Sequence, residues 1–150
     1  MRILIQRVKR ASVTIDNTLK AVIGQGVLIF VGICDDDTDD DIQWLVKKSV
    51  NLRIFDDENG IMNLSVTECG GDILAVSQFT LMASTKKGNR PSYIKAAKPE
   101  VSIPLYEKFC NELQKAINKP IGTGVFGADM KVELINDGPV TIFIDSKNKE

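Results

Sequence analysis

The stretch Asp72-Ile-Leu-Ala-Val-Ser77-Gln78-Phe79-Thr80-Leu81 joins an apolar strand to a cluster of small polar side chains. Its apolar part, from Ile73 to Val76, follows the turn signal Gly70-Gly71-Asp72 and predicts a buried strand. Because the polar residues arrive together where this strand leaves the core, their side chains and backbone N–H groups could form an oxyanion-binding site. The alternative is that the two hydroxyls bond neighbouring strands and the glutamine faces water. This stretch by itself favours that structural alternative.

The sequence before this stretch predicts a sheet with one helix packed across it. Apolar side chains in residues 3–15 predict two early strands, and further strands are expected from Leu19 to Ile23 and from Val27 to Ile33. Apolar residues recur at helical spacing between Ile42 and Val50, with acids before them and lysines later, as the helix dipole favours. The acidic run from Asp35 to Asp41 is therefore interpreted as a solvated loop that can cap this helix.

The sequence after the stretch predicts a second helix and a closing pair of strands. Apolar residues at helical spacing predict an amphipathic helix that starts near Ser102 to Pro104 and ends before Pro120. Closing strands are expected from Met130 to Ile135 and from Val140 to Ile144, because the turn formers Asn136-Asp137-Gly138-Pro139 predict a tight connection between them. This order of elements favours one α+β domain, residues 1–150, over a repeated βαβ array.

Composition narrows the class of protein and the chemistry open to it. The chain has 150 residues, 43% of them hydrophobic and 26% charged, which is typical of one soluble globular domain. It has no long apolar segment, so a cytoplasmic location is expected. Its 3 cysteines are widely spaced and predict reduced, structural thiols. The absence of histidine excludes Ser-His, Cys-His and His-based zinc chemistry.

Basic residues cluster shortly after the polar stretch. The net charge is -1, yet residues 86–98 contain no acid. The segment from Ser84 to Lys98 shows no sustained periodicity, so we expect a surface loop there. A solvated loop is one interpretation, and a surface for a polyanion is the other. The basic residues of the segment are Lys86, Lys87, Arg90, Lys95 and Lys98.

Three motifs in chain order resemble the signature segments of the D-aminoacyl-tRNA deacylase family. They are Met1-Arg-Ile-Leu-Ile-Gln-Arg7-Val-Lys-Arg-Ala-Ser-Val13, then Ser77-Gln-Phe-Thr-Leu81 with Gly88-Asn-Arg-Pro-Ser92, then Asn136-Asp-Gly-Pro-Val-Thr141. The departures, such as Tyr93 after the Arg-Pro-Ser segment, are apolar or aromatic exchanges outside the motifs. The resemblance implies a homodimer of barrel-like α+β subunits, each with a mainly antiparallel sheet and two main helices. It also implies hydrolysis of the ester that joins a D-amino acid, or glycine, to the 3′ end of tRNA.

The resemblance further implies the roles of particular residues. The expected catalytic residues are Ser77, Gln78, Phe79 and Thr80. The expected substrate-binding residues are Gly138, Pro139, Arg7, Met130 and Phe126, and the expected RNA-binding residues are Lys86, Lys87 and Arg90. The Gly138–Pro139 bond is expected to be cis, to enter the partner subunit's site and to reject L-amino acids by steric clash. Arg7 is expected to steady this loop, although without the resemblance it would be an ordinary exposed charge beside a strand.

Ester hydrolysis requires an attacking water, stabilisation of the oxyanion, and a proton for the departing ribose oxygen. In a chain without histidine, we expect the N–H groups of Phe79 and Thr80 to stabilise the oxyanion and Gln78 to orient the ester or the water. The ribose 2′-hydroxyl can both donate and accept a proton, so no metal or other cofactor is expected. One rival mechanism uses Thr80, or Ser77, as a covalent nucleophile, which would need a nearby base. A rival function is a non-catalytic module that binds the tRNA 3′ end.

Overall fold

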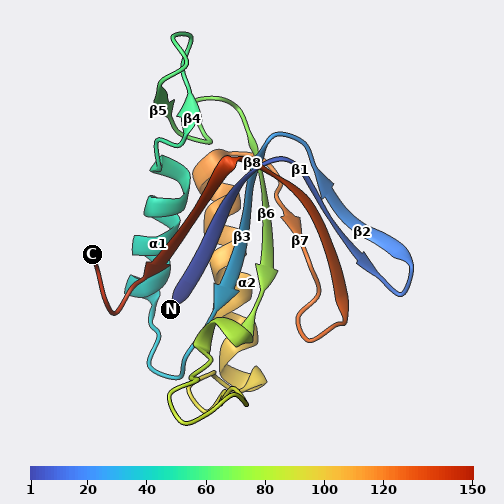
Figure 1. Ribbon diagram of the computed structural model, residues 1–150, viewed down its shortest axis with the longest axis vertical. Helices are drawn as coiled ribbons and strands as arrows, with labels where there is room; N and C mark the ends of the chain where they lie inside the picture. Colours follow the sequence, from blue (N-terminus) through green and yellow to red (C-terminus); the bar gives the residue numbers. More distant parts are fainter.

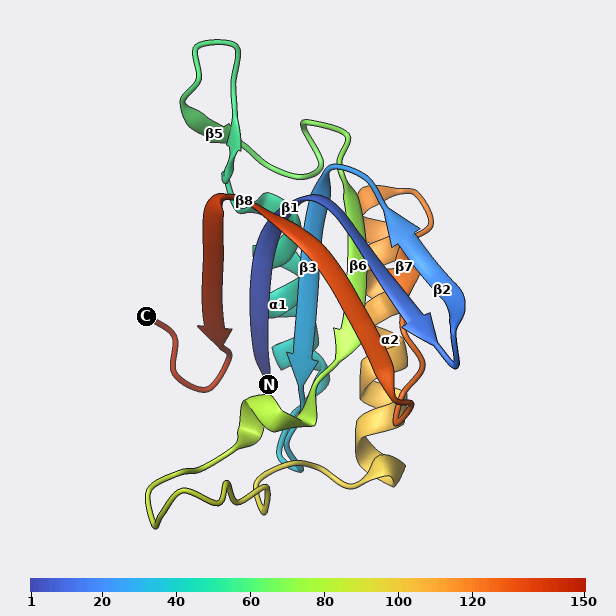
Figure 2. The same cartoon turned by 45° about the vertical axis from the view of Figure 1, so that its right-hand side comes forward.

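A computed structural model of the protein describes residues 1–150 and contains one strongly curved sheet packed against two helices (Figure 1). The sheet strands are β1 (Arg2–Ile15), β2 (Thr18–Ile23), β3 (Gly26–Gly32), β6 (Asp72–Ser77), β7 (Gly122–Thr123) and β8 (Met130–Asp145). Helices α1 (Asp39–Asn51) and α2 (Pro99–Ile117) lie on the same side of the sheet (Figure 2). Strands β4 (Phe55–Asp56) and β5 (Met62–Leu64) form a hairpin that projects from one end. The predicted barrel-like α+β fold is confirmed.

Strand β1 organises the sheet because it pairs with β2, β3 and β8, in each case antiparallel. The pairs β3–β6 and β6–β7 are parallel, so the sheet is mixed. The prediction of two early strands was wrong, since Arg2–Ile15 is one continuous strand. The exposed residues Lys9 and Arg10 interrupt the apolar pattern, but β8 pairs with β1 on both sides of them.

Strand β8 is also continuous, which corrects the predicted tight turn between two closing strands. Both halves of β8 run antiparallel to β1, with Gln6 paired to Thr141 and Val8 paired to Asn136. Between these pairs β1 advances two residues and β8 advances five, so β8 carries three extra residues as a bulge. The Gly138–Pro139 bond in this bulge is cis, as predicted, and Gly138 has a φ of 119°. The turn-forming residues therefore bend the strand and do not reverse it.

The central strands are buried on both faces, as their apolar runs predict. Alternate side chains of a strand point to opposite faces, so Ile29 and Ile73 contact the helices. Leu28 and Leu74 instead join a smaller apolar cluster on the other face of the sheet. The larger cluster includes Phe109 of α2 and anchors the helices to the strands that carry the polar stretch.

Helix α2 begins earlier than predicted. Pro99 occupies its first turn, where a missing N–H costs nothing because that group has no partner inside the helix. Pro104 lies inside the helix, and the predicted start near Ser102 to Pro104 was therefore wrong. The proline removes one hydrogen bond to the carbonyl of the exposed Glu100, near the helix start, and the helix continues through it. Neither helix has the length and apolar composition needed to cross a bilayer.

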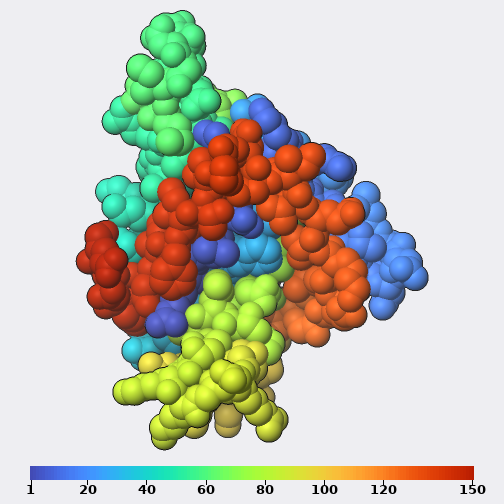
Figure 3. Space-filling model, viewed as in Figure 1, coloured from blue at the N-terminus to red at the C-terminus, as the bar shows by residue number.

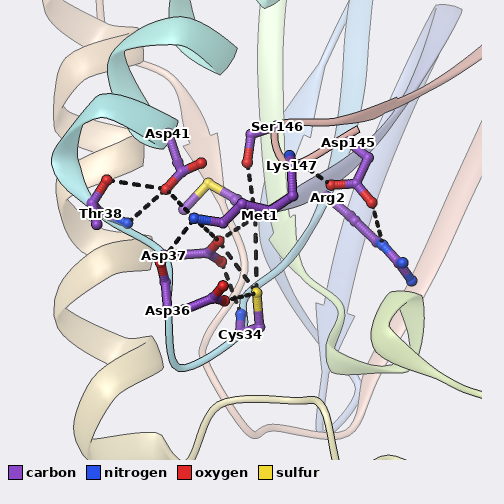
Figure 4. Close-up of polar contacts among 10 residues, drawn as sticks. All are labelled: Met1, Arg2, Cys34, Asp36, Asp37, Thr38, Asp41, Asp145, Ser146 and Lys147. Atoms are coloured by element: carbon purple, nitrogen blue, oxygen red, sulfur yellow. Dashed lines mark hydrogen bonds and ion pairs between the residues drawn. The ribbon is translucent and has the colours of Figure 1, made fainter. Parts of the chain in front are cut away.

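The two ends of the chain meet at the start of α1 (Figure 4). The Met1 ammonium group is buried and donates to the Asp37 carboxylate and, at 2.9 Å, to Ser146 Oγ. Lys147 Nζ lies 2.9 Å from Asp41, which also accepts a bond from the N-cap residue Thr38. The expectation of a wholly solvated acidic loop was wrong, because Asp37 and Asp41 are buried. Their partners come from the chain termini, which local sequence patterns do not reveal.

Candidate active site

The polar stretch changes direction where the buried strand ends. Strand β6 stops at Ser77, and the short 3-10 helix η1 (Phe79–Met82) begins two residues later. Between them, the Gln78 N–H donates to the carbonyl of Val31 in β3 at 2.7 Å. This bond ties the turn to the central strand β3. The start of η1 therefore has a defined position at the carboxyl ends of β3 and β6.

A pocket of about 310 Å³ opens beside this turn. Ser77, Gln78 and Phe79 form one wall, and the loop from Phe126 to Met130 forms another. Of the 14 lining residues 9 are hydrophobic, which is typical of a small-molecule site with a few polar groups. The structure thus brings together five of the predicted site residues. Thr80 does not line the pocket.

Two backbone N–H groups at the start of η1 have no hydrogen-bond acceptor. The N–H groups of Phe79 and Thr80 bond to no backbone or side-chain atom, as is usual for the first residues of a helix. The Ser77 hydroxyl likewise makes no hydrogen bond within the chain, although it lines the pocket. A ligand oxygen near the turn would therefore find free donors.

The side chain of Thr80 is held by its neighbour. Gln78 Nε2 donates a hydrogen bond to Thr80 Oγ1, and this is the only hydrogen bond of that hydroxyl within the chain. No carboxylate, amine or imidazole bonds to Thr80 to act as the base that a threonine nucleophile needs. The geometry therefore favours a positioning role for the Thr80 side chain.

The Gly138–Pro139 bulge lies at the other end of the sheet from this pocket. It faces Arg7 of β1. Arg7 pairs in register with Val27 of β3, and Val27 pairs with Ile73 at the start of β6. Ser77 lies four residues further along β6, a distance of about 13 Å at the rise of a strand. The bend of β8 and the start of η1 accordingly lie at opposite ends of the sheet (Figure 2). One chain does not bring Gly138, Pro139 or Arg7 into the pocket.

Arg7 is buried and connects the bulge to the β4–β5 hairpin. Its Nε donates to the carbonyl of Asp137 at 3.0 Å, and its Nη1 donates to the carbonyl of Ile54 at 2.6 Å. The carboxylates of Asp137 and Asp56 lie 3.4 and 3.6 Å from its guanidinium. The alternative of an ordinary exposed charge was wrong, since the side chain is 9% exposed.

The segment from Ser84 to Lys98 is a surface loop, as predicted. Reciprocal hydrogen bonds between Ser84 and Ser92, at 2.8 and 2.9 Å, close its base. Lys86, Lys87 and Arg90 are exposed at its tip, and none of them forms an ion pair. The loop forms a lobe at the lower end of the molecule, next to η1 (Figure 3).

One further group of residues has the composition of a metal site. The ligand atoms of Cys34, Asp36 and Asp37 lie within 4.8 Å of one another. The Met1 ammonium already pairs with Asp37, and Lys147 approaches the same carboxylate at 3.8 Å. Burial and the neighbouring carboxylates raise the pKa of the Cys34 thiol to about 12, which disfavours the thiolate that metals bind. We therefore interpret this group as part of the structural cluster in Figure 4.

Comparison with known proteins identifies the family. A sequence model described as "D-Tyr-tRNA(Tyr) deacylase" matches residues 4–145. The chain belongs to this deacylase family. It is 69% identical over 150 residues to the D-aminoacyl-tRNA deacylase of Bacteroides thetaiotaomicron and 63% identical to that of Flavobacterium psychrophilum, and each match covers 100% of both chains. The resemblance drawn from the three sequence motifs is confirmed.

Solved structures agree with the deacylase fold. One titled "c-Myc DNA Unwinding Element Binding Protein" superposes with a TM-score of 0.92 at 40% identity, covering 97% of this chain and 98% of its own. A second, titled as a probable eukaryotic D-amino acid tRNA deacylase, has a TM-score of 0.81 at 20% identity, covering 95% and 97%. This second likeness supports the fold alone.

Sequence reasoning missed the middle of one wall of the pocket. Gly127, Ala128 and Asp129 line the pocket between Phe126 and Met130. They lie in the connection from β7 to β8, where the sequence pattern predicts no helix or strand. The signal was the glycine, because Gly127 adopts a φ of 76° that other residues rarely tolerate, as expected for a tight turn.

Proposed function

We propose that this protein hydrolyses the ester bond of D-aminoacyl-tRNA and releases the free D-amino acid and the tRNA. The observation that carries the proposal is the pair of unpaired N–H groups at Phe79 and Thr80 beside a largely apolar pocket. Membership of the deacylase family supports the same assignment. The amino acid side chain would occupy the pocket, with its ester carbonyl directed at the start of η1.

In this proposal the backbone supplies the main catalytic groups. Water adds to the ester carbonyl, and the N–H groups of Phe79 and Thr80 stabilise the resulting oxyanion, an interaction worth several kcal/mol in other enzymes. The C–O bond to the ribose then breaks, and the ribose oxygen takes up the proton that the water loses. The adjacent 2′-hydroxyl can relay this proton because it both donates and accepts. The products are a carboxylic acid and a free 3′ hydroxyl.

Gln78 has a positioning role in the same mechanism. Its amide nitrogen donates to Thr80 Oγ1, which leaves the amide oxygen free to accept a bond from water or from the substrate ammonium. Ser77 can contact the substrate from the end of β6, because its hydroxyl is otherwise unpaired. Neither residue forms a covalent bond to the substrate in this mechanism.

A second copy of the chain completes the proposed site. The Gly138–Pro139 bulge is remote from the pocket of its own chain, so it acts in the site of the other subunit of a homodimer. A twofold axis then builds two such sites at once. Rigid main-chain atoms near the substrate α-carbon would clash with an L side chain and leave a D side chain free. Glycine has no side chain and is therefore also accepted.

RNA binding is assigned to the basic loop. Lys86, Lys87 and Arg90 are exposed beside η1 and are not neutralised by acids of the same chain. They would contact the phosphates of the acceptor end and hold the ester over the pocket. Charged tRNA is the substrate of translation, so the proposal places the protein in the cytoplasm.

A multiple-turnover deacylation assay tests the proposal and its rivals. Purified protein, at a concentration far below that of D-aminoacyl-tRNA, is expected to release all of the D-amino acid. Protein that binds this RNA and leaves the ester intact would support the binding-module alternative. A Thr80→Ala variant that remains folded separates the mechanisms. It is expected to retain turnover if the backbone N–H acts, and to lose all turnover if Thr80 is the nucleophile.

A further inference from the structure

Two aromatic side chains lie exposed at the rim of the pocket. Phe79 is 54% exposed and Tyr93 is 39% exposed, although both rings are large enough to be core residues. Their ring centroids are 5.0 Å apart, with an interplanar angle of 74°. Phe79 belongs to the pocket wall, and Tyr93 extends the aromatic surface outward from it.

Backbone hydrogen bonds fix the two segments that carry these rings. Phe79 begins η1, whose preceding residue is bonded to β3. Tyr93 directly follows Ser92, where the paired hydrogen bonds with Ser84 close the basic loop. The Tyr93 carbonyl also accepts a bond from the N–H of Ala96 at 2.9 Å. Because the backbone at both residues is fixed and the two rings contact each other, less conformational entropy would be lost when a ligand covers the pair.

The charge around the pair favours one kind of ligand. No acidic residue occurs between Asp72 and Glu100, while Lys86, Lys87 and Arg90 lie in the loop that ends just before Tyr93. Lys95 adds a further exposed cation two residues after Tyr93. Exposed aromatic rings beside unpaired cations are the combination that binds single-stranded nucleic acids, in which bases stack on the rings and phosphates contact the cations.

We propose that the Tyr93 ring, held edge-to-face against Phe79, is a stacking platform for the unpaired nucleotides that precede the reacting 3′-terminal nucleotide. This inference rests on the proposed function, because the ester in the pocket fixes where the RNA strand must leave the site. A base stacked on Tyr93 would lie between the ester and the phosphates held by the loop. Since every base has a π-face, the platform would tolerate different sequences at these positions.

Tyr93 is the residue to vary, because Phe79 also contributes a catalytic backbone group. Tyr93→Leu keeps apolar bulk and removes the ring, whereas Tyr93→Phe keeps the ring and removes the hydroxyl. Ile94→Ala is the matched control, since Ile94 is 88% exposed next to Tyr93 and has no ring. Each variant is assayed on D-aminoacyl-tRNA and on the same D-amino acid esterified to a single nucleoside, which has no preceding nucleotides.

The expected result is a loss confined to the long substrate. Tyr93→Leu should lower kcat/KM for D-aminoacyl-tRNA roughly tenfold, through KM, because one stacked base contributes about that factor. Its rate on the nucleoside ester should equal that of the wild type. Tyr93→Phe and Ile94→Ala should match the wild type on both substrates. Equal losses of Tyr93→Leu on both substrates, or no loss on either, would overturn the platform.

A binding measurement keeps the test independent of catalysis. A single-stranded RNA without an esterified amino acid is prepared with the fluorescent base 2-aminopurine before its 3′-terminal nucleotide. Stacking should quench this base in the wild type and in Tyr93→Phe, but not in Tyr93→Leu. Quenching that survives in Tyr93→Leu would contradict the proposal, even if the wild type failed to hydrolyse any ester and the proposed function itself were wrong. A rise in the dimer dissociation constant of Tyr93→Leu without loss of quenching would instead show that a second copy covers the pair.

Discussion

Arg7 Nε donates a hydrogen bond of 3.0 Å to the carbonyl oxygen of Asp137, which joins the first strand to the bulge in the last one. The same guanidinium bonds the carbonyl of Ile54, so one buried side chain holds two separate segments. An Arg7→Leu variant would leave both carbonyls without this donor. The Ile54 carbonyl is buried, where an unpaired group costs roughly 1–3 kcal/mol, and the partly buried Asp137 carbonyl costs less. We predict a large loss of unfolding free energy, measured by chemical denaturation, together with loss of deacylation.

Lys9 provides the control for Arg7. Its Nζ lies 3.6 Å from the carboxylate of the same Asp137, but its side chain is 61% exposed. Surface ion pairs contribute about 0–1 kcal/mol, so Lys9→Ala should be close to the wild type in stability and activity. If Arg7→Leu were as close to the wild type in stability and activity as Lys9→Ala, Arg7 would not position the bulge.

Gly138→Ala should disturb the bulge directly. A Cβ at this position would lie 2.7 Å from Arg7 Nη2 and 3.1 Å from Val140 Cγ2, and the φ of 119° is unfavourable for alanine. Strain of this kind costs on the order of 1–3 kcal/mol. We expect the variant to fold with reduced stability and to lose discrimination between D- and L-esters, which parallel assays of both esters would measure.

The control for Gly138 is Gly60→Ala in the β4–β5 hairpin. Gly60 has a φ of 73° but no atom within 4 Å of the added Cβ. It therefore shares the backbone strain and lacks the contacts. Unchanged chiral discrimination in Gly138→Ala, at the level of the Gly60→Ala control, would mean that the bulge does not touch the substrate.

Neutralising the basic loop should reduce the salt dependence of RNA binding. Each phosphate contact contributes about 0.7 to the slope of log K against log salt for a single strand. The triple variant Lys86→Gln, Lys87→Gln, Arg90→Gln should therefore make the slope shallower, by roughly 2 in magnitude. The measurement is tRNA affinity over a series of salt concentrations. An unaltered slope would place the RNA elsewhere on the surface.

The buried cluster formed by Met1, Asp37, Asp41, Ser146 and Lys147 should make the free energy of unfolding depend on pH. Burial favours a higher pKa for Asp41, but hydrogen bonds from Ser146, Lys147 and Thr38 outweigh it and hold the pKa well below its usual range. A carboxyl with a lowered folded-state pKa stabilises the fold above its unfolded-state pKa of about 3.9, and this contribution is lost as pH falls through the folded-state value.

We therefore predict that the free energy of unfolding falls as pH drops below about 5, and that Asp41→Asn flattens this decline. Chemical denaturation at a series of pH values measures both curves. Asp40→Asn is the matched control, because Asp40 lies in the same turn but is exposed. The assignment fails if Asp41→Asn and the wild type lose stability in parallel on acidification.

Much of the fold followed from local patterns. Apolar runs correctly located the buried strands β3 and β6, and the spacing from Ile42 to Val50 correctly located α1. The predictions failed where tertiary contacts overrode local preference. Asn136 to Pro139 have the composition of a turn, but pairing of both β8 halves with β1 keeps the strand continuous.

The site was predicted in part, for a similar reason. The polar stretch after β6 identified one wall of the pocket, because strand ends and their polar residues are visible in the sequence. The motif resemblance indicated Phe126 and Met130, which line the opposite wall. The partners of Arg7 could not be predicted from pattern alone, since Ile54 and Asp137 are far from it in the chain.

The most direct test of the account compares the initial hydrolysis rates of D-aminoacyl-, L-aminoacyl- and glycyl-tRNA by the wild-type protein under multiple-turnover conditions. The three esters should share one tRNA, and the D- and L-esters one amino acid, so that only the configuration at the α-carbon differs. We predict rapid cleavage of the D-ester and of the glycyl ester, with the L-ester left intact. Cleavage of the L-ester at the rate of the D-ester, or persistence of all three esters, would contradict the account.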